Sequence, residues 1–310
     1  MNAIVLDGAS KDYDGRTVLD GVSLAIPEGR CVALIGHNGA GKTTLMKLVL
    51  GLIAPTRGTV SVLGQAPAKA GSDWRRLIGF LPENVAFHDQ ITGADTLMFL
   101  ARLKGASPSV VTPLLERVGL QRAAANRVKT YSKGMRQRLG LAQALIGKPR
   151  LLLLDEPTTG LDPVLRQEFF DIIRHLTESG ATVVLSSHIL TELEARTDIA
   201  AILRDGKLAA FGGLEALRNE AGLPVTVRAK GNAPAIAGKL NGSFSKTVSA
   251  DKASIDIDCP PAKKMALLRT LAGLSDICMD VDVRLPSLDD LYLHYSGRRI
   301  GPDVTMEDTA

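Results

Sequence analysis

Cysteine is scarce in this chain, with three residues in 310. The number is odd, and Cys31, Cys259 and Cys278 show neither CxxC nor Cys/His spacing. This pattern argues against a disulfide framework and against a zinc site, so we expect three buried, reduced thiols. The five histidines and the methionines are equally scattered, and no compact set of copper ligands is expected.

Long hydrophobic runs and long basic runs are also missing. The most apolar stretch, residues 45–53, is far shorter than the roughly 18 residues of a membrane span and contains Lys47. The N-terminus lacks the basic start and apolar segment of a secretory signal. Lysine and arginine form no run longer than a pair despite a net charge of +4, which argues against a nucleic-acid partner. We therefore expect a cytoplasmic globular protein.

A glycine-rich segment is the strongest positive signal. Residues 36–43 read Gly-His-Asn-Gly-Ala-Gly-Lys-Thr and match the phosphate-binding pattern GxxxxGK[ST], with an apolar run before them and a helical pattern after. In such a loop the backbone N–H groups point at the phosphates, Lys42 reaches the β- and γ-phosphates, and the Thr43 hydroxyl ligates Mg²⁺. A chance match in a glycine-rich turn is the alternative, which the regular flanks disfavour. The expected nucleotide-binding residues here are Gly36, His37, Asn38, Gly39, Ala40, Gly41, Lys42, Thr43 and Thr44.

An acidic motif accompanies this loop. Four leucines at 151–154 precede Asp155 and Glu156, as in a Walker B strand. Asp155 is expected to hold Mg²⁺, and Glu156 is expected to polarise the attacking water. The alternative, a buried strand that ends in a solvated acidic turn, is disfavoured because the motif occurs together with the phosphate loop.

Strand and helix patterns alternate along the chain, which indicates an α/β fold with a buried parallel sheet. Apolar segments at 3–6, 22–26, 59–63 and 77–81 are expected to form a nucleotide-facing β part. After Gly222-Leu223-Pro224 the alternation of apolar and polar residues indicates a second, small α+β domain. The expected division is a nucleotide-binding domain over 1–218 with a helical subdomain at about 88–148, an accessory domain over 219–297 and a disordered tail over 298–310.

Residues 131–138 read Tyr-Ser-Lys-Gly-Met-Arg-Gln-Arg, and here the sequence resembles the ATP-binding cassette (ABC) ATPases. Their usual signature is Leu-Ser-Gly-Gly-Gln; Ser132 and Gly134 match it, whereas Lys133 and Met135 replace Gly and Gln. The resemblance implies a P-loop NTPase cassette with a parallel sheet core, an antiparallel β part and a helical subdomain. It also implies that residues 132–135, the signature segment, contact the γ-phosphate of ATP held by an opposite subunit.

The same resemblance assigns four further positions. Tyr13 lies where an aromatic residue stacks on adenine, Asp162 lies in the D-loop, and His188 matches the switch histidine. A surface aromatic in a turn and a capping or packing histidine are the alternatives for Tyr13 and His188. Glu83 replaces the glutamine of the coupling loop; it keeps an oxygen for Mg²⁺ or water but loses an amide donor. The implied catalytic residues are Glu156, His188 and Glu83, the Mg²⁺ ligands Thr43, Asp155 and Glu83, and the cofactors ATP and Mg²⁺.

The sequence contains one phosphate loop and one signature segment, which is half of what a working pair of ABC cassettes contains. The resemblance therefore implies a homodimer, and a separate integral membrane permease as partner, with the chain at the cytoplasmic face of the inner membrane. Soluble ABC ATPases that act on nucleic acid or ribosomes are the alternative class. They usually carry a long coiled coil or two cassettes in one chain, and this sequence shows neither.

Five segments, the last two in the expected accessory domain, resemble the NosF group within the ABC family. This narrower resemblance implies a NosY-like permease, a periplasmic NosD-like protein reached through it, and copper/sulfur supply for nitrous oxide reductase maturation. A generic ABC-2-type exporter of drugs, lipids or polysaccharides is the alternative. The segments are 79–87, 102–105, 128–144, 220–225 and 286–292.

Overall fold

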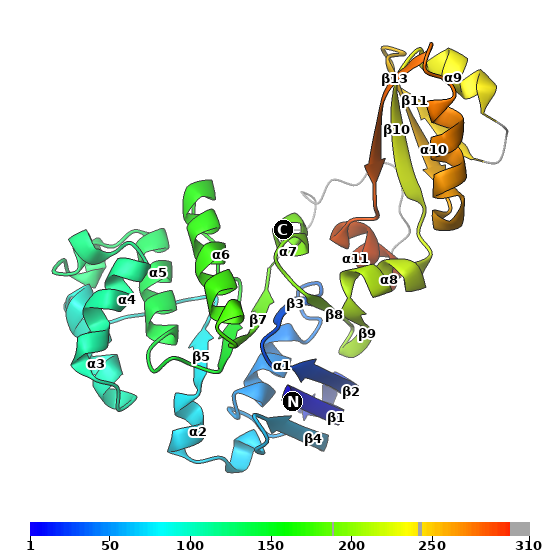
Figure 1. Ribbon diagram of the computed structural model, residues 1–310. Coiled ribbons are helices and arrows are strands. Elements are labelled where there is room, and N and C mark those ends of the chain that lie inside the picture. Colours follow the sequence, from blue (N-terminus) through cyan, green and yellow to red (C-terminus); the bar gives the residue numbers. More distant parts are fainter. Residues whose placement is uncertain (188, 241–243, 298–310) are drawn as a thin grey trace. The chain divides into compact units, whose positions relative to one another are not determined.

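The computed structural model describes residues 1–187, 189–240 and 244–297 (Figure 1). The chain forms two compact units, the first over residues 1–213 and the second from Leu214 onward. This division falls a few residues before the domain boundary expected at 218. The expected tail, 298–310, lies outside the described residues.

A six-stranded sheet forms the centre of the first unit, in the order β5-β6-β7-β3-β8-β9. Every residue of β3, β6 and β7 is buried. Parallel strands that are covered on both faces need such continuous apolar runs. These runs are what made the strands recognisable in the sequence. The first five strands of that order run parallel, and β9 is antiparallel to β8. The bounds are β3 (Cys31–Ile35), β5 (Ile78–Leu81), β6 (Leu151–Leu154), β7 (Thr182–Ser186), β8 (Ile199–Arg204) and β9 (Lys207–Gly213).

A three-stranded antiparallel sheet lies beside it, in the order β2-β1-β4. Its strands are β1 (Asn2–Tyr13), β2 (Arg16–Pro27) and β4 (Arg57–Val62), and their apolar side chains share one core with the parallel sheet. The expectation for residues 77–81 was wrong. Residues 78–81 form β5, at an edge of the parallel sheet next to β6, because a short, mostly apolar run suits either kind of sheet.

Helices complete the first unit. The helical segment expected at about 88–148 contains α3, α4 and α5. Thr92 caps α3, and its side chain accepts a hydrogen bond from the Asp95 N–H. The half-buried Lys104 Nζ donates to the carbonyls of Ile78 and Ile146 at 3.0 and 3.1 Å, so it ties the end of α3 to the sheet. The α-helices are α1 (Lys42–Val49), α2 (Ser72–Arg76), α3 (Gly93–Leu103), α4 (Val111–Arg117), α5 (Lys133–Ala144), α6 (Pro163–Glu178) and α7 (Leu190–Glu194).

The second unit contains a four-stranded antiparallel sheet in the order β11-β12-β10-β13. Apolar residues of β10 and β12 pack with α9 and α10 into a separate core, while alternate residues of the same strands are polar. The sequence patterns missed α9 and β11, which are short and rich in small or polar residues. The elements are α8 (Leu214–Ala221), β10 (Val225–Gly231), α9 (Ala233–Lys239), β11 (Ser245–Val248), β12 (Ser254–Cys259), α10 (Lys264–Ala272), β13 (Cys278–Arg284) and α11 (Leu288–Ser296).

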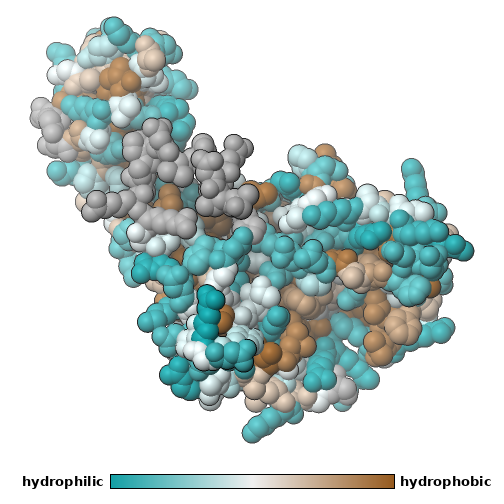
Figure 2. Space-filling view, turned by 180° about the vertical axis from the view of Figure 1, so that it is seen from behind, coloured by the Kyte–Doolittle hydropathy of each residue, from teal (hydrophilic) through white to brown (hydrophobic). Residues whose placement is uncertain are grey.

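Within the described ranges, no helix combines the length and the apolar character that crossing a bilayer requires. The face drawn in Figure 2 is largely hydrophilic, with smaller hydrophobic patches between.

Candidate functional site

The glycine-rich loop connects the carboxyl end of β3 to the amino end of α1. Gly41 caps α1 in a left-handed conformation, with φ of 105°, and a Cβ there would lie 2.6 Å from the Leu19 side chain. A Cβ on Gly36 would lie 2.7 Å from the Leu203 carbonyl oxygen. Only glycine satisfies both constraints, and the tight turn directs the free N–H groups of the helix start toward one point. This is the geometry of an anion site.

Lys42 supplies the positive charge of this site. It is 9% exposed, and its Nζ donates to the carbonyl oxygens of Gly36 and, at 3.3 Å, of His37. Burial lowers the pKa of Lys42, and the nearby carboxylates, with Glu156 first, act in the opposite direction. A buried cation beside a helix N-terminus favours a ligand with several negative charges.

The acidic pair follows β6 at the same edge of the sheet. Asp155 and Glu156 are each 6% exposed, and the Thr43 hydroxyl lies 3.3 Å from Asp155 Oδ2. Ser186 holds this pair: its Oγ donates to Asp155 Oδ1 at 2.7 Å and accepts from the Glu156 N–H at 3.0 Å. The sequence analysis did not single out Ser186. The feature that could have identified Ser186 is its position at the end of β7. This strand pairs with β6, so that Ser186 lies beside Asp155.

One cavity of about 150 Å³ brings these groups together. It lies at the carboxyl ends of the parallel strands, where open α/β sheets bind ligands. Its volume suits part of a nucleotide rather than a whole one, which would need several hundred Å³. Gly36 and the fully buried Ala40 are not part of its lining. The lining contains Val18 and, from the expected site, His37, Asn38, Gly39, Gly41, Lys42, Thr43, Thr44, Glu83, Asp155 and Glu156.

The oxygen atoms in this cavity suit a hard divalent cation. The Thr43 hydroxyl and the carboxylates of Asp155 and Glu83 are the ligand types that Mg²⁺ prefers. Within the described ranges, no group of three or more His, Cys, Asp or Glu side chains is placed to hold a metal ion. A cation here would therefore need oxygen atoms from a phosphate ligand and from water.

The signature segment lies outside this cavity. Ser132 caps α5 by accepting from the Met135 N–H at 3.2 Å, so its O–H is placed at the helix start. Gly134 is buried, and a Cβ on it would lie 3.2 Å from the Gly160 carbonyl oxygen. Asp162 caps α6 through the Leu165 N–H at 3.0 Å. The signature segment and the D-loop thus pack on each other within the chain, without reaching its own phosphate loop.

Tyr13 and His188 are the remaining expected site residues. Tyr13 ends β1, is 39% exposed, and has the Lys11 Nζ 5.2 Å from its ring centre. Its side chain does not line the 150 Å³ cavity, and its expected stacking on adenine stays a prediction. His188 lies outside the described residues, so its expected role stays a prediction.

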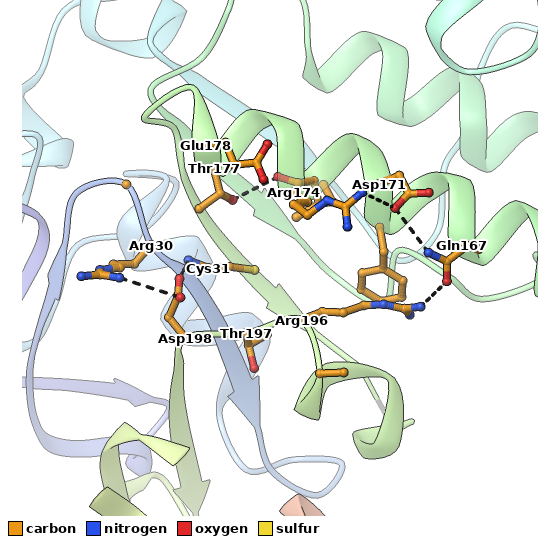
Figure 3. A pocket seen from close by; sticks show the side chains of 14 residues that line it. Arg30, Cys31, Gln167, Asp171, Arg174, Thr177, Glu178, Arg196, Thr197 and Asp198 are labelled. Carbon is orange, nitrogen blue, oxygen red and sulfur yellow. Dashed lines mark hydrogen bonds and ion pairs between the residues drawn. The ribbon is translucent and has the colours of Figure 1, made fainter. Parts of the chain in front are cut away.

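A larger cavity, of about 520 Å³, lies at the opposite edge of the sheet, near the amino ends of β3 and β8 and beside α6 (Figure 3). Arg30 lies 3.8 Å from Asp198, and Arg174 lies 3.0 Å from Asp171. The guanidinium of Arg196 lies over a phenylalanine ring instead. Because its arginines are balanced by carboxylates and no helix begins here, this cavity lacks the excess positive field that a triphosphate requires.

Cys31 lines this cavity but should be chemically inert. Burial, reinforced by Asp198, raises the pKa of its thiol to about 12. At pH 8 roughly one molecule in 10⁴ would carry the thiolate, which is the reactive form. We expect iodoacetamide to leave Cys31 unlabelled in the folded chain and to label it in urea, as read by peptide mass spectrometry. The half-buried Cys278 is the internal control, and equal labelling of both in the folded chain would contradict this prediction.

Comparison with known proteins agrees with this geometry. A family model described as "ABC transporter" matches residues 19–159. The daunorubicin resistance ATP-binding protein DrrA3 of Streptomyces coeruleorubidus is 35% identical over 306 residues, covering 95% of this chain and 96% of that protein. The Nod factor export ATP-binding protein I of Rhizobium sp. (strain N33) is 33% identical over 303 residues, covering 96% and 98%.

The fold agrees with a solved cassette as well. The dimeric, post-hydrolysis structure of the ATP-binding cassette MJ0796 bound to ADP and Pi matches with a TM-score of 0.64 and 25% identity. The match covers 68% of this chain and 98% of that one. The expected fold class, a P-loop NTPase cassette, is confirmed. On this geometry and these likenesses, the chain belongs to the ATP-binding proteins of ABC transporters.

Proposed function

We propose that this chain binds and hydrolyses ATP to power a separate membrane permease of an exporter. The observation that supports this most directly is the 150 Å³ cavity, which joins the phosphate loop to two buried carboxylates of the Walker B type. A module that only bound a nucleotide would not need Glu156 beside the cation ligands Thr43 and Asp155.

The roles of the site residues follow from their contacts. Lys42 and the N–H groups at the start of α1 would hold the β- and γ-phosphates, and Thr43 and Asp155 would hold Mg²⁺, which neutralises charge on the phosphates. Ser186 fixes the Asp155 carboxylate and the Glu156 backbone, so that the Glu156 side chain can accept a proton from the attacking water. His188 is proposed as the switch histidine.

Two chains are needed for a complete site in this proposal. The cavity is too small for a whole nucleotide, and the signature segment of the same chain does not reach it. Ser132, Lys133, Gly134 and Met135 of a second copy would close over the γ-phosphate. The similarity to the dimeric MJ0796 cassette supports this arrangement. Binding of ATP would then favour the closed pair, and hydrolysis would release it.

The exporter assignment is supported by relatives that match along nearly the whole chain, including the second unit. One is named for daunorubicin resistance and the other for Nod factor export. We therefore propose an ABC-2-type exporter, with this chain at the cytoplasmic face of the inner membrane. The NosF-like role is a second candidate, supported by sequence segments in both units, among them 286–292. It would add a NosY-like permease, a NosD-like periplasmic protein and copper/sulfur supply to nitrous oxide reductase.

Capture of the partner separates these candidates. The Glu156→Gln chain, held on ATP, should retain its permease when purified from detergent-solubilised native membranes, and mass spectrometry would identify it. The Lys42→Ala chain is the matched control, because it should not reach the ATP-held state. A drug- or lipid-type permease would support the exporter, and a permease with a periplasmic repeat protein of the nitrous oxide system would support the second candidate. Ribosomal or nucleic-acid-bound material instead would contradict both.

Glu83 gives a prediction specific to this chain. It places a third carboxylate in the cavity, where family members usually have glutamine. Glu83→Gln removes a negative charge near the γ-phosphate and leaves the cation a neutral amide oxygen, a weaker ligand than the carboxylate. We expect faster ATP hydrolysis at saturating Mg²⁺ and a higher Mg²⁺ concentration for half-maximal rate, each by about threefold. ATPase rates across a Mg²⁺ titration measure both, with the exposed Glu168→Gln as control; a slower reaction at saturating Mg²⁺ would contradict the proposed charge effect.

A further inference from the structure

Strand β13 leaves one side of the second unit's sheet unpaired. It pairs with β10 on its inner side and is the last strand in the sheet order (Figure 1). Within the described ranges, residues 279–285 have no backbone hydrogen bond to any element other than β10. Every second N–H and C=O along its outer side is therefore available to another strand.

This edge lacks several of the devices that usually prevent strand association, although it carries three charged side chains, Asp280, Asp282 and Arg284. The opposite edge strand, β11, has four residues and includes Lys246, whereas β13 has seven residues and contains neither lysine nor proline. The register shift in its pairing with β10 lies near its start, at Gly231. Met279, Val283 and Leu285 are 83%, 36% and 51% exposed. Short length, lysine, proline and bulges are common protections of edge strands, so β13 is the less protected of the two edges of this sheet.

The occupant can be deduced from the charges on β13. Asp280, Asp282 and Arg284 alternate with apolar residues. Asp280 is paired with Lys230 at 2.8 Å, and Arg284 lies 3.4 Å from Asp282 of the same strand, where both side chains are about half exposed and can also reach a second strand. If two copies of β13 pair antiparallel about a two-fold axis, residues directly opposite each other point to the same face. Each residue must therefore lie opposite a residue of the second copy that is an even number of positions away, so the axis passes beside one residue and not between two. An axis at Val281 would set Asp280 against Asp282 of the other copy, and an axis at Asp282 would set that residue against itself.

An axis at Val283 avoids every such conflict. It sets Asp282 opposite Arg284 of the second copy, twice by symmetry, and Val281 opposite Leu285, also twice. Val283 meets its own counterpart on the axis. Opposite charges and apolar pairs across an antiparallel ladder are each stabilising. Pro286 then follows directly, which ends the ladder because proline has no N–H to donate.

We propose that β13 is a homodimer interface, in which residues 281–285 of two copies pair antiparallel about an axis at Val283. The two four-stranded sheets become one sheet of eight strands. This contact needs no nucleotide, and it is separate from the ATP-dependent closure of the phosphate site. It would keep two copies together while the nucleotide sites are open.

Disulfide formation tests the register. In a full-length Cys278→Ser background without nucleotide, Val283→Cys should form a disulfide-linked dimer under mild oxidation, because opposite Cα atoms lie about 4.5–5.5 Å apart. Val281→Cys is the matched control on the same strand and face. Its counterpart would lie about 13 Å away along the ladder, too far for a disulfide. A several-fold excess of dimer for Val283→Cys on a non-reducing gel is the expected result.

A charge reversal tests the same contact without cysteines. Arg284→Asp sets like charges opposite each other twice, and should weaken the nucleotide-free dimer by about tenfold in sedimentation experiments. Within the chain this substitution also removes the ion pair of Arg284 Nε with Asp282 Oδ2 at 3.4 Å. Both side chains are about half exposed, so thermal unfolding should change only slightly, and ATP binding should stay close to that of the wild type. A monomeric wild-type chain without nucleotide, equal cross-linking at 281 and 283, or cross-linking of Val283→Cys only to a different protein would each overturn the proposal.

Discussion

Glu156→Gln is expected to lower the ATPase rate by about 100-fold or more, the scale on which a lost general base acts, while ATP still binds. The amide is nearly the same size as the carboxylate, so the contacts that Ser186 makes to the Glu156 N–H and to Asp155 remain. Lys42 and Thr43 remain as well. What is lost is the oxygen that accepts a proton from water. Phosphate release and equilibrium binding of a fluorescent ATP analogue measure the two properties separately.

The same variant should change the oligomeric state. If hydrolysis reopens the closed pair, blocking hydrolysis should leave the ATP-bound dimer populated. Size-exclusion chromatography with ATP and Mg²⁺ reads this directly, and omission of Mg²⁺ gives the baseline. Glu168→Gln is the matched control, because Glu168 is an exposed carboxylate on α6 away from the cavity. Brisk turnover by Glu156→Gln would show that another residue polarises the water.

The predictable parts of the site are those whose functional residues lie close together in the sequence. The phosphate loop needs its glycines at fixed spacing because Gly36 and Gly41 have no room for a Cβ. The Walker B carboxylates are recognisable because they end a strand that is buried on both faces. In such segments the spacing itself carries the information, and the structure places Lys42, Asp155 and Glu156 around one cavity.

The unpredicted parts depend on contacts between distant segments. Ser186 lies 31 residues from Asp155, and only the pairing of β6 with β7 brings the two together. Residues 77–81 were assigned to the wrong sheet because a short apolar strand does not specify its neighbours. The free edge of β13 was also beyond sequence reasoning, since α9 and β11, which fix the strand order of that sheet, carry weak patterns.

Gly134→Val is expected to remove ATPase activity while a single chain still binds ATP. Gly134 is buried against the Gly160 carbonyl, and even a Cβ would lie 3.2 Å from that oxygen and 3.4 Å from Leu161 Cδ2. The carbonyl oxygen belongs to the backbone and cannot move away as a side-chain end could, so the larger valine must displace the D-loop or the start of α5. In the proposed dimer these segments supply N–H donors to the γ-phosphate of the partner. Loss of such donors should lower the rate by about 100-fold.

Whether the signature segment acts in trans is shown by which functions the Gly134→Val chain keeps and which it loses. ATP affinity of the isolated chain should change by less than about threefold, because the phosphate loop and Lys42 are untouched. Gly71→Val is the matched control: Gly71 has open space around its Cβ position and no left-handed φ, so activity should survive.

Mixing Gly134→Val with Lys42→Ala chains should restore part of the rate. In a mixed pair, the intact phosphate loop of the first chain faces the intact signature segment of the second. If the mixture stays as inactive as its components while each variant remains folded, the signature segment does not complete the site of a partner.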